Sequence, residues 1–309
     1  MNNRSLPLSA LLHAFLLLAL FVASSTAAVA QSVVIAVIDG ARYSESFGAG
    51  SKYMPRVWKD LRPKGTIYTN FRNDGATITC PGHASVLTGV WQDLPNDGTR
   101  RPAEPTVFEF FRKQTGLPEH SCFVVSGKKK LEMLTHSVDT SFGAVFGASF
   151  LAGETTSDTA TWTQLVRAMD SYHPRLIMIN FPSVDVNGHA NTWTKYIEAI
   201  READKIIHRL WKKIEADSIY RHTTTMFVTN DHGRHDVAHG GFQNHGDSCQ
   251  GCRHIMLLAM GPGFPSGAVV KDQHTQIDIA PTIGEILGFP FPAREGKSLL
   301  PVRKTPSLK

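Results

Sequence analysis

The sequence predicts an α/β fold in which helices cover both faces of a mainly parallel central sheet. The prediction rests on two patterns that alternate along the chain. One is a series of short, continuously apolar runs, typical of parallel strands buried on both faces. The other is a series of longer stretches in which apolar residues recur every three or four positions, as on the buried side of a helix. Strand alternating with helix indicates an α/β sandwich.

Five segments have the composition of buried strands, namely residues 33–38, 122–125, 176–179, 225–228 and 255–260. Four others have helical periodicity, namely residues 106–113, 159–170, 194–215 and 279–287. The clearest is 194–215, where Ile200, Ile207 and Ile214 mark one apolar face. The last ends at Gly288, two residues before Pro290, which is a typical helix stop signal.

Residues 1–30 are predicted to be a secretory signal outside this fold. Arg4 is the only charged residue there, an apolar run covers 11–23, and small residues precede Ala30. Cleavage after Ala30 would leave one domain over 31–309, exported to the periplasm or secreted. The apolar run is short for a membrane span, so we expect no stable membrane anchor after cleavage. An uncleaved anchor is the alternative.

The charge pattern argues against a nucleic-acid partner. The formal net charge of the whole chain is only +5, and the basic residues are scattered. The one short basic cluster, Lys128, Lys129 and Lys130, is interpreted as a solvated turn.

The four cysteines are Cys80, Cys122, Cys249 and Cys252. In an exported protein, the close pair Cys249 and Cys252 favours a local disulfide. A structural zinc site is not supported, because the chain has no second CxxC motif. A redox role lacks the strand–helix context expected of a thioredoxin-like motif.

Residues suited to metal binding follow three of the predicted strands. Asp39 comes directly after the first strand, Asp185 and His189 follow the third, and Asp231 and His232 follow the fourth. The carboxyl ends of parallel strands meet at one edge of a sheet, where α/β proteins place their sites. Mixed Asp and His ligands favour zinc or a neighbouring transition metal over calcium or magnesium.

The stretch from Thr77 to Gly89 contains a candidate nucleophile. Pro81 is predicted to be the first residue of a helix, which would put Thr79 and Cys80 at its amino end. Such an end attracts phosphate or sulfate oxygens, and a hydroxyl beside a metal can ionise and attack. A capped helix without catalytic function is the alternative.

Several motifs, in order along the chain, together resemble those of the alkaline phosphatase superfamily. They are Asp39-Gly40, Thr79-Cys80-Pro81-Gly82-His83 with Leu87-Thr88-Gly89, Asp185-x-x-Gly188-His189, Asn230-Asp231-His232-Gly233, His245-Gly246 with Met260-Gly261-Pro262-Gly263, and Asp278-Ile279-Ala280-Pro281-Thr282. More narrowly, the chain is similar to the type I phosphodiesterase/nucleotide pyrophosphatase branch, in which the Thr of a T-x-P-x-H motif is the nucleophile.

The resemblance implies two divalent metal ions, zinc by default. One site would be built by Asp39, Thr79, Asp231 and His232, and the other by Asp185, His189 and His245. Thr79 would attack phosphorus in a small-molecule phosphate ester, and water would hydrolyse the resulting phosphothreonine.

Three assignments within this set have alternatives or weaker support. His239 competes with His245 as the third histidine ligand, and Cys80 competes with Thr79 as the nucleophile. Asn96 falls where relatives have a phosphate-contacting Asn, although its Pro-Asn-Asp-Gly context is first of all a turn.

Other functions remain alternatives to a phosphodiesterase. A sulfatase needs Cys or Ser at the position of Thr79 and Arg at that of His83, so the sequence argues against one. A phosphomonoesterase, a phosphonate hydrolase, a phosphosugar mutase and a non-catalytic metal-binding relative also stay open. Export disfavours the mutase.

Overall fold

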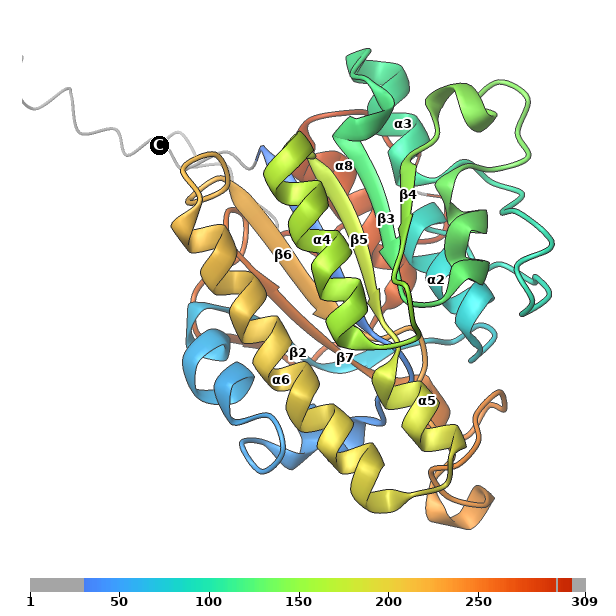
Figure 1. Ribbon diagram of the computed structural model, residues 1–309, viewed down its shortest axis with the longest axis vertical. Helices are drawn as coiled ribbons and strands as arrows, with labels where there is room; N and C mark the ends of the chain where they lie inside the picture. The colour runs from blue at the N-terminus through green and yellow to red at the C-terminus, as the bar shows by residue number, and fades with distance from the viewer. Residues whose placement is uncertain (1–30, 293, 302–309) are drawn as a thin grey trace, which may run out of the picture.

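One nine-stranded sheet forms the centre of the molecule in the computed structural model, which describes residues 31–292 and 294–301 (Figure 1). The predicted signal at 1–30 lies outside the described residues. The strands are β1 (Ser32–Ile38), β2 (Gly65–Arg72), β3 (Cys122–Ser126), β4 (Ser149–Ala152), β5 (Leu176–Phe181), β6 (Thr224–Thr229), β7 (His254–Met260), β8 (Ala268–Val270) and β9 (His274–Thr275).

The strand order is β4-β3-β5-β1-β6-β7-β2-β8, with β9 also paired to β2. Strands β4, β3, β5, β1 and β6 are all parallel, and β7 runs antiparallel to both β6 and β2. The predicted α/β class with a mainly parallel sheet is therefore confirmed.

Helices cover both faces of the sheet (Figure 1). The α-helices of the described residues are α2 (Thr79–Thr88), α3 (Val107–Thr115), α4 (Asp158–Tyr172), α5 (Ser183–His189), α6 (Trp193–Ala216), α7 (Gln250–Arg253) and α8 (Ile279–Leu287). Alternate side chains of β1 point to opposite layers. Val34 and Ile38 share a core with α4 and α6, whereas Val33 and Val37 share one with α2, α3 and α8.

The predicted start of α2 was two residues late. The helix begins at Thr79, with Ile78 as its N-cap, so Pro81 is its third residue. The first N–H groups of a helix have no intrahelical partner, so a proline is tolerated throughout the first turn. Thr79 is therefore the first residue of the helix rather than part of the preceding loop.

The predicted Cys249–Cys252 disulfide is not formed, and all four cysteines are free and buried. Cys249 is the N-cap of the short helix α7, and its carbonyl accepts a hydrogen bond from Cys252 N at 3.1 Å. The Cys249 N–H group donates to Asp247 Oδ1 at 2.9 Å, which holds this carboxylate beside the turn.

Within the described part of the chain, no helix combines the length and the apolar character needed to cross a membrane.

The buried carboxyl group of Asp158, at the start of α4, makes stability depend on pH. Its Oδ1 accepts from Ser183 N at 2.9 Å, whereas Oδ2 is buried without a partner. Burial raises the pKa of Asp158 to about 6. The folded state therefore holds a proton that the unfolded state has lost between about pH 4 and 6, and stability falls as pH rises through that window.

We expect Asp158→Asn to raise the free energy of unfolding at pH 8 by about 1–3 kcal/mol, because the uncompensated buried charge is removed. Urea unfolding at pH 4.5 and pH 8 measures this, and the gain over the wild type should shrink at the lower pH. A variant that is less stable than the wild type at pH 8 would contradict the prediction.

Candidate functional site

The carboxyl ends of four neighbouring parallel strands bring the predicted acidic residues together. In sheet order, β3 leads to Lys128, β5 to Asp185 on α5, β1 to Asp39, and β6 to Asp231 and His232. The sheet itself therefore sets the spacing of these side chains. Asp185 and His189 both lie on helix α5, and their i, i+4 spacing turns both side chains to one side of this helix.

Asp39, Asp231 and His232 form one group of metal-ligand atoms, which all lie within 4.8 Å of one another. Asp39 uses its Oδ2 to accept from Asn180 Nδ2 at 2.7 Å, and Asp231 uses its Oδ1 to accept from Gly40 N at 3.1 Å. The other oxygen of each carboxylate and His232 Nε2 are buried and have no hydrogen-bond partner.

These three unpartnered atoms fit a divalent cation. His232 Nδ1 lies 2.8 Å from the carbonyl oxygen of Gly233, so the ring proton belongs on Nδ1 and the lone pair on Nε2. Two carboxylate oxygens and one imidazole nitrogen, buried together without partners, would be costly without an ion. Carboxylate oxygen and imidazole nitrogen are both ligands that zinc accepts in proteins.

A second group contains Asp185, His245 and, again, His232. His245 Nδ1 lies 2.9 Å from Thr77 O, which leaves its Nε2 as the acceptor, 3.5 Å from Asp185 Oδ1. His189 Nε2 lies 3.1 Å from His245 Nε2 and 3.4 Å from Asp185 Oδ1. The side chain of His189 is 47% exposed, so this group opens to solvent.

His239 lies in another part of this region. It ends a short 3₁₀ turn (Val237–His239), its side chain is half exposed, and its Nδ1 lies 2.6 Å from Asp236 Oδ1. The structure thus places His245, and not His239, against Asp185.

Thr79 is buried at the amino end of α2, and its Oγ1 lies 3.4 Å from Lys128 Nζ. Most first-turn N–H groups of α2 are already engaged or missing. Cys80 N donates to Asn96 Oδ1 at 2.8 Å, Gly82 N donates to Ile78 O, and Pro81 has no N–H group. The Thr79 N–H remains as the first-turn donor for a ligand.

Asn96 is placed beside this helix end by contacts of its own. Its Oδ1 accepts from Cys80 N and from Lys130 Nζ, the latter at 3.1 Å. The amide is thus oriented within reach of the Thr79 region, with its oxygen turned toward the protein.

The interpretation of the lysine cluster as a solvated turn is wrong for Lys128, whose side chain is only 11% exposed. Its Nζ lies 2.8 Å from Asp39 Oδ2 and 2.6 Å from Asp185 Oδ2. The clustered carboxylates need a compensating cation, which a sequence reading based on local charge alone does not reveal. The sequence signal that could have identified Lys128 as a site residue is its position two residues after the end of β3.

Three further residues of the site were not predicted: Arg234, Asn180 and His83. Arg234 is fully buried and donates to Asp185 Oδ1. Asn180 donates to Asp39 Oδ2 and also lies 3.0 Å from His83 Nε2. His83 Nδ1 lies 3.2 Å from Asp231 Oδ2, without hydrogen-bond geometry. These side chains hold the carboxylates in place.

The carboxylates differ in proton affinity. Burial, followed by the charge of Asp231, raises the pKa of Asp39. Burial also opposes the ionisation of Asp185, but the surrounding positive charges, led by that of Lys128, together outweigh it and hold the pKa of Asp185 well below its usual range. Burial lowers the pKa of His245 to about 2. His245 is therefore neutral at pH 7, as a metal ligand must be.

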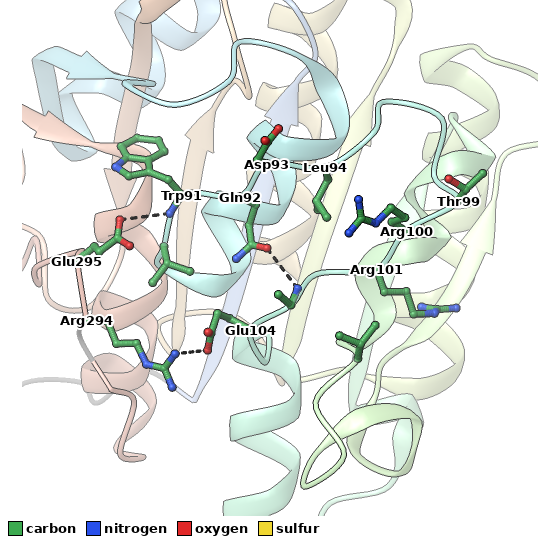
Figure 2. Close-up of a pocket in the computed structure, with 13 residues that line it drawn as sticks. Trp91, Gln92, Asp93, Leu94, Thr99, Arg100, Arg101, Glu104, Arg294 and Glu295 are labelled. Atoms are coloured by element: carbon green, nitrogen blue, oxygen red, sulfur yellow. Dashed lines mark hydrogen bonds and ion pairs between the residues drawn. The ribbon is translucent and has the colours of Figure 1, made fainter.

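A cavity of about 660 Å³ lies elsewhere, between the segment that follows α2 and the carboxyl-terminal part of the chain (Figure 2). Arg294 pairs with Glu104 across it, and Gln92 Oε1 accepts from Ala103 N at 3.3 Å. None of the predicted ligands lines this cavity. It is therefore not the catalytic centre.

The family model of the Metalloenzyme superfamily matches residues 100–290, which is more than half of the chain. The chain belongs to this superfamily. The matched span includes Asp185, Asp231, His232 and His245, whereas Asp39 and Thr79 precede it.

Similar proteins differ in their activities. A 2,3-bisphosphoglycerate-independent phosphoglycerate mutase of Gloeobacter violaceus is 30% identical over 141 residues, which cover 44% of this chain and 25% of that protein. The phosphonate monoester hydrolase of Silicibacter pomeroyi has a TM-score of 0.61 and 16% identity, with 87% of this chain and 76% of that one covered. A 2-O GAG sulfatase has a TM-score of 0.63 and 14% identity, covering 87% and 73%.

The chain thus spans about a quarter of the length of the mutase. The solved structures support the alkaline-phosphatase-like fold alone. The superfamily implies divalent metal ions, and the activity of this member is a separate question.

We expect His232→Ala to weaken the binding of a divalent cation by more than about 100-fold, because the variant lacks a ligand that both donor groups contain. Equilibrium dialysis with zinc measures the affinity. His239→Ala is the matched control and should leave the zinc affinity of the two donor groups unchanged. Equal loss of affinity in the two variants would contradict the placement of His232 at the metal centre.

Proposed function

We propose that this protein is an exported two-metal hydrolase that cleaves phosphate esters through Thr79, with phosphodiesters or nucleotide-type compounds as the favoured substrates. The observation that carries the proposal is the position of Thr79. Thr79 is the first residue of helix α2, and its hydroxyl lies beside the buried ammonium group of Lys128. This ammonium group also contacts Asp39 and Asp185, one carboxylate from each donor group.

The donor atoms divide into two sets, one for each proposed cation. Asp39, Asp231, His232 and the Thr79 hydroxyl would hold the first, and Asp185, His189 and His245 the second. Zinc suits this mixture of carboxylate and imidazole ligands. Bound cations supply the positive charge that ionises a neighbouring hydroxyl or water at neutral pH and stabilises a leaving oxygen.

Protein side chains carry out the transfer of the phosphoryl group. Thr79 Oγ1 forms a bond to phosphorus as the bond from phosphorus to the leaving oxygen breaks. Water then attacks the phosphothreonine, the bond between Thr79 Oγ1 and phosphorus breaks, and the hydroxyl is restored. The Thr79 N–H and the Lys128 ammonium group orient the phosphoryl oxygens and offset their charge, and the Asn96 amide supports the first turn of α2.

The exposure of His189 favours hydrolysis over a mutase reaction. A mutase must return the phosphoryl group to its bound sugar and keep water away, whereas this donor group opens to solvent. A threonine cannot supply the aldehyde that a sulfatase derives from Cys or Ser, and Cys80 is buried and lies one position too late.

We expect zinc-loaded enzyme to hydrolyse bis-nitrophenyl phosphate, and Thr79→Val to abolish this turnover while Thr79→Ser keeps part of it. The panel also contains nitrophenyl phosphate and nitrophenyl sulfate. Expression with the native leader lets mass spectrometry of the same preparation read whether the chain begins at Gln31.

Dominant turnover of the monoester would change the assignment to a phosphomonoesterase, and turnover of the sulfate would change it to a sulfatase. Unchanged turnover in Thr79→Val would exclude Thr79 as the nucleophile. Bound metal without turnover of any ester would favour a non-catalytic metal-binding protein.

We expect Lys128→Met to lower kcat/KM for the preferred ester by about 100-fold, because the positive charge beside Thr79 is lost. Lys129→Met is the matched control, since Lys129 is the exposed neighbour on the same segment. Initial rates and zinc content should be measured together. A Lys128 variant that keeps wild-type kcat/KM with its metal bound would contradict the role assigned to this side chain.

A further inference from the structure

A second set of metal-ligand side chains lies in the segment between β6 and β7, apart from the catalytic donors. We define the cysteine cluster as His235, Asp247, Cys249 and Cys252. Donor atoms of His235, Asp247 and Cys252 all lie within 4.8 Å of one another, and Cys249 belongs to a separate group with Asp236 and His239. Both cysteines are buried, with Cys252 fully so.

His235 shows the same sign of a missing partner as His232. Its Nε2 is buried without a hydrogen bond and lies 3.4 Å from Asp247 Oδ2. The other oxygen of Asp247 accepts from Cys249 N at 2.9 Å, which orients the carboxylate. One imidazole nitrogen and one carboxylate oxygen therefore face each other with no hydrogen bond between them.

The two thiols complete the set of donors. Cys252 Sγ lies within 4.8 Å of the donor atoms of His235 and Asp247. Cys249 precedes the same turn, and its backbone N–H donates to Asp247 Oδ1 at 2.9 Å. The turn thus brings Cys249 next to the carboxylate that lies against Cys252 and His235. Two sulfurs, one imidazole and one carboxylate give four ligands, the number that a structural zinc site needs.

The backbone brings the two halves of the cysteine cluster together independently of any ion. Gly233 N donates to Cys252 O at 2.8 Å, and Arg234 N donates to Gly251 O at 2.9 Å. A Cβ atom on Gly251 would come within 2.4 Å of Arg234 O, so only glycine permits this close approach. The CxxC turn is therefore held against the segment that carries His235.

We propose that His235, Asp247, Cys249 and Cys252 bind a structural zinc ion, independently of the proposed catalytic function. Thiolate and imidazole ligands select zinc among common cellular cations. On binding, the two thiols lose their protons to solvent and each sulfur forms a bond to the ion. The ion would tie the two ends of the loop that carries His245.

Cobalt offers a direct test, because thiolate bound to Co²⁺ gives a charge-transfer absorption in the near ultraviolet. Reduced, metal-free full-length mature chain is titrated with Co²⁺. We expect this absorption to appear, to saturate at about one equivalent and to disappear when zinc is added. Cys249→Ser with Cys252→Ser should abolish it, and His235→Ala should weaken cobalt binding at least about 10-fold.

Three matched variants separate this site from its neighbours. Cys80→Ser should keep the absorption, which excludes the thiol beside the catalytic centre. His232→Ala should keep it while losing ester turnover, so that failure of the zinc site and failure of the proposed function are distinguishable. His239→Ala should keep it, because His239 is the exposed histidine next to Cys249.

Several results would overturn the proposal. One is the absence of the absorption in the reduced wild-type chain, a measurement that does not depend on any variant folding. Another is its persistence in the double cysteine variant, or its loss in His239→Ala but not in His235→Ala. A third is a native chain that carries no zinc and whose Cys249 and Cys252 react with an alkylating reagent only after reduction, because the pair would then be a disulfide.

Discussion

Three carboxylates, Asp39, Asp185 and Asp231, are forced together at the ends of adjacent strands, and the rest of the site compensates their charge. All three are buried, and burial of an unpaired carboxylate is costly. Lys128 bridges Asp39 and Asp185, Arg234 contacts Asp185, and backbone and amide N–H groups take one oxygen each of Asp231 and Asp39. The oxygens left over are those that face His232.

At Asp39, the same constraint explains how a lysine and a metal ion can share one carboxylate. Lys128 contacts Oδ2 of Asp39, whereas the unpartnered atom of that carboxylate is Oδ1. The lysine and a metal ion would therefore use different oxygens. The ammonium group lowers the net negative charge of the cluster and leaves Oδ1 of Asp39 available to a cation.

The sequence was sufficient to predict the features that depend on local pattern. Continuous apolar runs identified β1, β5 and β6, and their polar ends gave Asp39, Asp185 and Asp231. It was insufficient where tertiary contacts decide. β2 contains polar positions, and β4 and β8 are short, so none of these three strands has a clear periodicity. Lys128 looks like any surface lysine until the sheet order places β3 beside β5. Arg234 and Asn180 acquire a role only through partners distant in sequence.

His232 belongs to both donor groups, and in the proposed two-metal arrangement this would set an order of filling. Its Nε2 has one lone pair, so it can coordinate one cation at a time. An ion held by Asp39, Asp231 and His232 withdraws that donor from the other group, which then depends on His189 to join Asp185 and His245. Because His189 is the most exposed of these ligands, the second position is the more easily vacated one. Two cations bound in the proposed arrangement would therefore be thermodynamically coupled, and the affinity for each would depend on the presence of the other.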